Sequence, residues 1–193
     1  MKLKPFLTSE SEAGCDEAGR GCLAGPVVAA AVILPKGYNN KQLNDSKKIS
    51  EKIRNQLRID IEKKATAIGI GVVDEKKIDQ INILQASLLA MHIAIKNLNT
   101  VPSHLIIDGN KFNSYPEISH DCIVKGDNKF MNIAAASIIA KTKRDELMKK
   151  LSEEHPEFFW HQNKGYPTKK HREAIFKYGK SEYHRKSFRV STI

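Results

Sequence analysis

The chain has 193 residues, which is enough for one domain with a sizeable core, and its 40% hydrophobic and 28% charged residues are ordinary for a globular protein. A net charge of +10 favours a polyanionic partner, above all nucleic acid, although lysines that only promote solubility are the alternative. Three cysteines without a CxxC pair argue against a disulfide framework and a zinc site, and residues 1–14 lack the apolar core of a signal peptide.

The predicted elements alternate between strands and helices. Apolar runs bounded by Pro, Gly or charged residues predict strands, and apolar residues four positions apart, such as Ile53, Leu57 and Ile61, predict helices. This alternation predicts a single α/β domain over residues 1–193, with a helical C-terminal portion from about residue 152. In chain order we expect a strand over 27–34, a helix from about 50, a strand over 66–73, a helix over about 82–98, strands over 104–107 and 121–124, and helices over about 133–151 and 168–178.

Basic residues are concentrated toward the C-terminus. Residues 141–193 contain 14 Lys and Arg against 7 Asp and Glu, whereas residues 1–140 contain 18 against 15. The longest apolar run, residues 27–34, is far too short to cross a bilayer. We therefore expect a cytoplasmic, monomeric protein that binds nucleic acid and no membrane.

Carboxylates adjoin apolar, strand-like runs at three places, each with a glycine nearby: Asp16-Glu17, Asp108 and Asp127. Loops at strand ends are where open α/β sheets assemble their sites. Clustered carboxylates without nearby His or Cys are hard oxygen ligands suited to Mg²⁺ or Mn²⁺, and in a basic protein they indicate two-metal phosphoryl chemistry. For any one of these acids taken alone, capping of a turn or a helix is the commoner role.

Asp16 and Glu17 raise a geometric question, because neighbours in a regular strand point to opposite faces. We expect the strand to end or bulge there, so that both side chains reach one cluster. Residues 19–21 (Gly-Arg-Gly) follow and offer backbone N–H groups and a guanidinium to a phosphate. Residues 19–24 also match a loose dinucleotide-binding pattern, but Pro26 and a β-branched run follow in place of a helix, which makes this alternative weak.

Seven blocks of sequence together resemble bacterial ribonuclease HII, the type 2 ribonuclease H family, in the family's order over essentially the whole chain. Because only 15 residues precede Asp16, we expect this family rather than ribonuclease HIII, which carries an N-terminal substrate-binding domain. Residues 128–131 are bulkier than the small polar residues expected after Asp127. The blocks are GCDEAGRGCLAGPVVAAAVIL (14–34), LNDSKK (43–48), LIIDGN (105–110), VKGD (124–127), IAAASIIAKTKRDELM (133–148), NKGYPTKKHREAI (163–175) and HRKSF (184–188).

The resemblance implies a ribonuclease H-like fold, with a central mixed five-stranded sheet flanked by helices. It implies an Mg²⁺- or Mn²⁺-dependent endoribonuclease that cleaves the RNA strand of RNA–DNA hybrids and incises 5′ to ribonucleotides embedded in duplex DNA. Such cleavage leaves 3′-OH and 5′-phosphate ends. By position, the family's metal-binding catalytic acids fall on Asp16, Glu17, Asp108 and Asp127, its ribonucleotide-reading loop on Gly19, Arg20 and Gly21, its junction-sensing tyrosine on Tyr166 and its phosphate contact on Lys47.

A basic module that binds RNA–DNA hybrids without cutting them, its carboxylates being structural, is the alternative function. Outside the proposed site, we expect residues 158–160 (Phe-Phe-Trp) to pack beneath the C-terminal helix. We expect His184 at the surface or in a cap, because no paired metal-ligand spacing surrounds it. Arg144, on a predicted helix, faces either phosphate or solvent.

Overall fold

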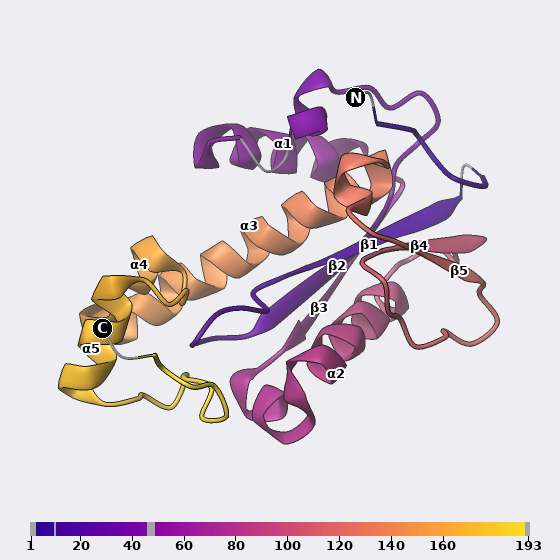
Figure 1. Ribbon diagram of the computed structural model, residues 1–193. Coiled ribbons are helices and arrows are strands. Elements are labelled where there is room, and N and C mark those ends of the chain that lie inside the picture. The colour runs from indigo at the N-terminus through magenta and orange to yellow at the C-terminus, as the bar shows by residue number, and fades with distance from the viewer. Residues whose placement is uncertain (1–2, 10, 46–48, 192–193) are drawn as a thin grey trace.

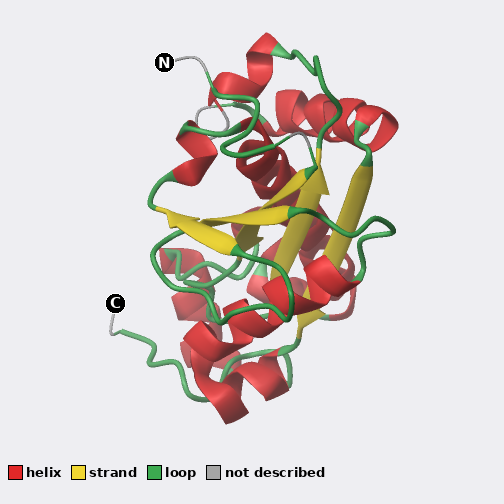
Figure 2. Ribbon diagram, turned by 90° about the vertical axis from the view of Figure 1, so that its right-hand side faces the viewer, coloured by secondary structure: helices red, strands yellow, loops and turns green. Residues whose placement is uncertain are grey.

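The computed structural model describes residues 3–9, 11–45 and 49–191, and one five-stranded sheet with helices on both faces forms its centre (Figures 1 and 2). The strands are β1 (Glu12–Ala18), β2 (Val27–Ile33), β3 (Ala67–Val73), β4 (His104–Asp108) and β5 (His120–Ile123). The helices are α1 (Glu51–Lys64), α2 (Glu75–Lys96), α3 (Met131–Glu154), α4 (Trp160–Asn163) and α5 (Lys169–Tyr178), with short 3₁₀ turns η1 (Lys41–Asp45), η2 (Gly126–Asn128) and η3 (Pro156–Phe158). The predicted α/β class is confirmed.

β1 lies at the centre of the sheet, whose strand order is β3-β2-β1-β4-β5. It pairs antiparallel with β2 and parallel with β4, and the outer pairs are β2 with β3, antiparallel, and β4 with β5, parallel. The sheet is therefore mixed, as expected. The ladder with β2 continues to Ala18, whereas the ladder with β4 stops where Cys15 meets Ile107. The last residues of β1 thus have a strand on one edge only.

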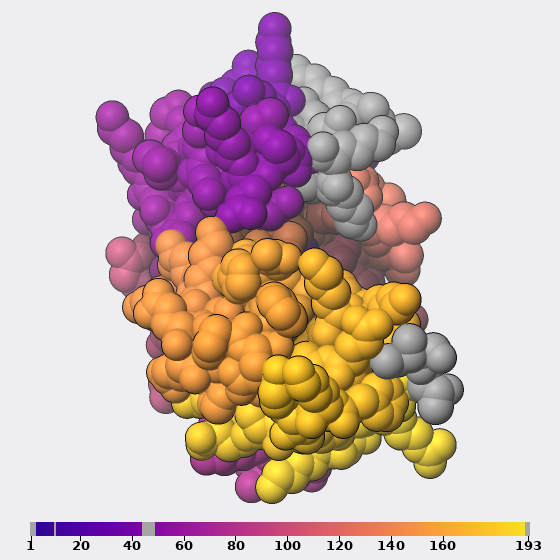
Figure 3. Space-filling view, turned by 90° about the vertical axis from the view of Figure 1, so that its left-hand side faces the viewer, coloured from indigo at the N-terminus to yellow at the C-terminus, as the bar shows by residue number. Residues whose placement is uncertain are grey.

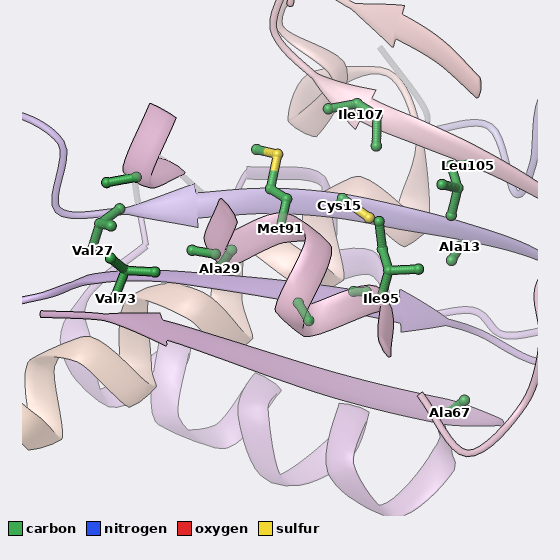
Figure 4. Packing of buried hydrophobic residues seen from close by; sticks show 14 of the residues in the cluster. Ala13, Cys15, Val27, Ala29, Ala67, Val73, Met91, Ile95, Leu105 and Ile107 are labelled. Atoms are coloured by element: carbon green, nitrogen blue, oxygen red, sulfur yellow. The ribbon is translucent and has the colours of Figure 1, made fainter. Parts of the chain in front are cut away.

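β2 is buried along its whole length because helices cover both of its faces. Ala29 and Ala31 belong to the apolar cluster on the α2 side, seen from close by in Figure 4. Ala30 and Val32 belong to the cluster formed with α1 and α3. On the α2 side the packing is close, since a Cβ on Gly71 of β3 would lie 2.0 Å from the carbonyl oxygen of Ala90.

α2 begins seven residues earlier than predicted and contains a break. Asp74 caps its first turn by accepting a hydrogen bond from the Lys77 N–H, and Asn82 has a left-handed φ of 64°. The apolar spacing after residue 82 therefore predicted only the part beyond the break. By length and composition, α2 is the one helix in the described ranges that could span a membrane, but many of its apolar residues pack on the sheet, as in the core helix of a globular protein.

The C-terminal portion packs against the loop that follows β1, and Figure 3 shows it (orange to yellow) beside α1 (purple). Phe158 and Trp160 are buried, with ring centroids 5.1 Å apart, as the packing prediction requires. The same prediction is wrong for Phe159, which is 38% exposed. The helical prediction also covers only part of this portion, because residues 179–191 contain no helix or strand.

Candidate active site

The carboxylates lie where β1 loses its neighbour β4. Asp16 and Glu17 follow Cys15, the last residue of β1 that pairs with β4, and Asp108 follows Ile107 on β4 itself. Parallel pairing in this register therefore sets Asp108 beside the open edge of β1. Three of the four predicted acids are brought to one place by a single pairing between strands that are far apart in the sequence.

The expectation that the strand ends or bulges at the acids is wrong. β1 stays regular, with Asp16 opposite Ala30 and Glu17 opposite Ala29 on β2. The two side chains consequently leave opposite faces of the sheet: Asp16 accepts a hydrogen bond from Ser137 of α3, and Glu17 lines a hollow on the α2 side together with Asp108. The open edge, rather than a bulge, leaves both carboxylates within electrostatic range of Asp108.

This arrangement concentrates negative charge in a poorly solvated place. Burial raises the pKa of Asp16 well above its usual value, and the charges of Glu17 and Asp108 raise it further. Burial also raises the pKa of Glu17, although Arg20 lies 3.1 Å from its carboxylate and opposes the shift. Hard oxygen donors crowded in this way fit a divalent cation, which would remove the repulsion. Over the described ranges, however, no three His, Cys, Asp or Glu side chains stand ready to hold a metal ion, so the carboxylates would have to turn toward one.

Asp127 lies in the neighbouring turn. It belongs to η2 and is 2% exposed, and the preceding Gly126 donates its N–H to Asp108 Oδ1 at 2.6 Å. The Asn128 side chain donates to Asp127 Oδ1 at 3.1 Å. The bulky residues that follow have a structural explanation, since Phe130 and Met131 are buried at the start of α3. Asp127 thus directly follows the residue whose N–H bonds Asp108, which brings the η2 turn next to the end of β4.

Residues 19–21 form a turn directly after the acids. Gly19 is buried with φ +99°, and a Cβ there would lie 2.0 Å from Arg144 Nε, so the fold itself demands glycine. Arg20 and Gly21 are exposed, and a Cβ on Gly21 would meet no atom within 4 Å. Glycine at position 21 is therefore not explained by packing, and it leaves the backbone open to a ligand. The turn leads into β2 rather than into a helix, so the dinucleotide-binding alternative is wrong.

Tyr166 lies beside this turn. The residue is 40% exposed, its hydroxyl hydrogen-bonds with the Cys22 side chain, and the Arg144 guanidinium lies 5.9 Å from its ring centroid. An exposed face and an anchored hydroxyl suit a ring that stacks on a sugar or a base. Lys47, the predicted phosphate contact, lies outside the described residues.

The sequence did not predict the burial of three further residues near the site. Arg144 and Arg185 are 2% and 0% exposed, although Arg144 was predicted to face phosphate or solvent. His184 was predicted at the surface or in a cap; it is 1% exposed, and its Nδ1 accepts the Ser181 N–H as in a cap, but the surface placement is wrong. Each lies in a basic or polar stretch of sequence, which gives no local signal of burial.

A buried hydrogen-bond chain holds the backbone of Tyr166. Because the Ser181 N–H donates to His184 Nδ1, His184 carries its proton on Nε2, which lies 3.2 Å from His171 Nε2. That nitrogen of His171 also accepts the Trp160 Nε1–H, so Nδ1 of His171 carries the proton and donates it to the Tyr166 carbonyl. Both histidines are thus neutral.

Comparisons with known proteins identify the family and the fold of the chain. The family model described as Ribonuclease HII matches residues 13–191. The protein named Ribonuclease HII of Bacteroides thetaiotaomicron is 58% identical over 189 residues, which cover 97% of this chain and 94% of that protein. The crystal structure of ribonuclease H2 from Pyrococcus horikoshii OT3 superposes with a TM-score of 0.76 at 25% identity, covering 93% of this chain and 94% of that one. Bst-RNase HIII in complex with Mn²⁺ shares the fold, with a TM-score of 0.71 at 19% identity over 92% of this chain and 67% of that one.

Proposed function

The chain belongs to the ribonuclease HII family and is an endoribonuclease, and we propose that it cleaves the RNA strand of RNA–DNA hybrids and incises 5′ to single ribonucleotides embedded in duplex DNA. The products would carry 3′-OH and 5′-phosphate ends. The observation that carries this proposal is the group of carboxylates at the open edge of β1, directly beside an exposed Arg20 and an unobstructed Gly21. The carboxylates repel one another in the free protein, and bound cations would relieve this repulsion. Cations held next to a surface that can bind phosphate are suited to phosphodiester hydrolysis.

We assign the divalent cations of the reaction to Asp16, Glu17, Asp108 and Asp127, with Mg²⁺ or Mn²⁺ as the metal. When bound, such cations supply an activated water and stabilise the leaving oxygen. The chain's own residues orient the ligands: Ser137 donates to Asp16, and the Gly126 N–H donates to Asp108. Hydrogen bonds of this kind fix the direction in which a carboxylate presents its remaining lone pairs.

Substrate recognition is assigned to the turn and to Tyr166. RNA differs from DNA at the 2′-OH, which both donates and accepts hydrogen bonds, so the exposed backbone at Gly21 can read it at close range. Gly19 shapes the turn, and Arg20 can hold a phosphate oxygen once it leaves Glu17. Tyr166 stacks on the sugar of the following deoxynucleotide. Lys47 is assigned a contact to backbone phosphate, as the family resemblance implies.

Three broader expectations accompany this function. We propose that the protein acts as a monomer, resides in the cytoplasm and uses no membrane. The basic residues 141–193 would contact phosphates without reading sequence, because phosphate contacts position a duplex and carry no base information.

The test uses a DNA duplex that contains one ribonucleotide, incubated with Mg²⁺, with Mn²⁺ or with a chelator. We expect metal-dependent incision 5′ to the ribonucleotide, lost in Asp16→Asn. Asp121→Asn on β5 is the matched control, since this carboxylate pairs with His104 and its side chain is 57% exposed. Hybrid binding that survives chelation, without cleavage of embedded ribonucleotides or longer RNA tracts in either metal, would instead support the non-cutting binding module.

A further inference from the structure

Arg144 and Arg185 come from different elements, and both bond the turn after β1. Arg144, on α3, donates through its guanidinium to the carbonyl oxygens of Pro26 (2.9 Å), Ala24 (3.0 Å) and Lys164 (2.7 Å). Arg185, in the segment after α5, donates to the carbonyl oxygens of Gly19 (2.7 Å), Arg20 (2.9 Å) and Gly25. All the guanidinium nitrogens of both arginines thus donate to main-chain carbonyls of residues 19–26 and 164.

Neither arginine forms an ion pair with a carboxylate among the described residues. Burial of a cation without a counter-ion is expensive, and an apolar pair of similar volume often gives equal or greater stability. The two charges also repel each other: the pKa of Arg185 falls to about 10, chiefly through burial and also through the nearby Arg144. A gain in folding stability therefore does not explain why two arginines occupy these buried positions. Their distinctive property is a planar fork that fixes several carbonyls at once.

The turn needs such an external template. Residues 19–26 form neither helix nor strand apart from one bridge at Ala24, and Gly19 and Gly25 adopt left-handed φ values of +99° and +77°. Besides the guanidinium bonds, three main-chain hydrogen bonds tie the turn to the C-terminal portion: the Leu23 N–H donates to the Gly165 carbonyl, the Gly25 N–H to the Tyr183 carbonyl, and the Arg185 N–H to the Leu23 carbonyl. The turn therefore depends on Arg144 and on residues 164–185 for its shape, in addition to the two glycines of its own sequence.

Arg144 also touches the second recognition element. It bonds the carbonyl of Lys164, two residues before Tyr166, and its guanidinium lies 5.9 Å from the Tyr166 ring centroid. One side chain thus spans the turn that faces the ribonucleotide and the ring that faces the next sugar. The distance between these two elements decides whether both can engage one RNA–DNA junction.

We propose that Arg144 and Arg185 are positioning residues that hold the 19–21 turn and Tyr166 at the separation required to recognise a ribonucleotide followed by a deoxynucleotide. This rests on the proposed function. Arg185 is itself held in place from α2, because Asp79 accepts the N–H groups of Lys186 and Ser187 at 2.8 and 3.0 Å. Lys180 reinforces the same segment by donating to the Arg185 carbonyl.

The experiment compares two substrates with the wild-type protein and with Arg144→Lys and Arg185→Lys. One substrate is duplex DNA with a single ribonucleotide, and the other is a hybrid with a continuous RNA strand, which offers many registers and no obligatory junction. A lysine keeps the charge but cannot serve three divergent carbonyls. We expect kcat/KM on the single ribonucleotide to fall by about ten-fold or more beyond any fall on the hybrid, mainly in kcat, because orientation is lost rather than affinity.

A merely structural role predicts a different result. Loss of folded protein would lower both activities in the same proportion, so an unchanged ratio in folded Arg144→Lys and Arg185→Lys overturns the proposal. Arg58→Lys is the matched control, because Arg58 forms ion pairs with Glu62 and Glu146 away from the turn, and it should leave the ratio unchanged.

Should the lysine variants fail to fold, Asp79→Asn gives a milder perturbation, since it weakens only the anchor of Arg185. We expect the ratio of kcat/KM on the single ribonucleotide to kcat/KM on the hybrid to shift in the same direction, but by less. If this variant has the same ratio as the wild type, the proposal is overturned as well. If the wild-type protein itself fails to incise the single-ribonucleotide duplex, the proposed function has failed instead, so the two failures are distinguishable.

Discussion

Two buried groups of charge adjoin residues 19–26, and they are built in opposite ways. Asp16 is 6% exposed and has Glu17 and Asp108 as repelling neighbours. Arg144 and Arg185 are as deeply buried, but seven hydrogen bonds to carbonyl oxygens satisfy them. A bound cation can neutralise the charge of the acids, whereas the guanidinium groups of the arginines are already hydrogen-bonded to main-chain carbonyls. Burial of charge alone therefore does not mark the reacting centre; the crowding of several buried charges of one sign does.

The sharpest way to test this comparison is to neutralise one acid. In Asp16→Asn we expect kcat/KM to fall by roughly a thousand-fold, since a metal contact supplies several kcal/mol of transition-state stabilisation. At the same time the melting temperature of the metal-free protein should rise, because repulsion with Glu17 and Asp108 is removed. Cleavage assays and thermal unfolding with a chelator measure the two effects. A lower melting temperature would mean that the carboxylate is structural.

The glycines of the turn divide between the two roles. Gly19→Ala must strain a φ of +99° and displace Arg144, so we expect a loss of about 2–4 kcal/mol in the free energy of unfolding. Gly21→Ala meets open space, so its stability should stay within about 0.5 kcal/mol of the wild type. Its cleavage of embedded ribonucleotides should nevertheless fall by about ten-fold, because a methyl group blocks close approach to the 2′-OH. Denaturant titration and kinetics separate the two variants, and equal stability losses would contradict this division.

Acid should weaken the scaffold through its neutral histidines. Burial lowers the pKa of His171, and it lowers that of His184 to about 3, with the His171 ring as the next cause. An unfolded histidine titrates near 6.5, so below that pH the unfolded state binds protons that the fold excludes. The contribution of His184 to stability is therefore complete above about pH 6.5 and declines until about pH 3. Urea titrations at pH 7, 5.5 and 4.5 should show this decline in the wild type and a smaller one in His184→Gln.

The smallest effect is expected at an exposed ion pair. Lys169 and Glu173 on α5 lie 3.9 Å apart, with side chains 73% and 47% exposed. Glu173→Gln should change the free energy of unfolding by less than about 0.5 kcal/mol, because water and salt screen such pairs. A large loss in a denaturant titration would show that charge on this surface matters as much as charge in the core.

The strands and most helices were predictable because their signals are local. Residues 27–34 and 66–73 carry β-branched or small apolar runs, and the structure has strands at Val27–Ile33 and Ala67–Val73. α2 was predicted only from residue 82 onward, since Asn82 breaks the periodicity that the preceding turns would have continued. β1 was least clear, because a strand with Asp16 and Glu17 inside it does not look like one.

The candidate site depends on contacts that no local pattern contains. Asp108 meets Asp16 only because β1 and β4 pair in parallel, and that pairing is decided by the whole sheet. Arg144 stands near two lysines, and Arg185 precedes another, so a buried cation and a solvated one look alike in sequence. His184 was misplaced for the same reason. Residue types identified the chemistry, whereas the fold alone determined which residues are buried.

The bond between Arg185 and Gly19 joins residues 166 positions apart. Ribosomes add roughly 5–20 residues per second, so about 10–30 s separate the synthesis of the turn from the synthesis of its template. Asp108 and Asp127 are made during that interval, so all four carboxylates and Gly21 exist before Arg185 does, while the turn beside them still lacks its template. The recognition surface is therefore one of the last parts of this protein to fold after synthesis. A nascent chain that meets nucleic acid before Arg185 is made would therefore carry the proposed catalytic carboxylates, but the turn that recognises the cleavage site would not yet be ordered.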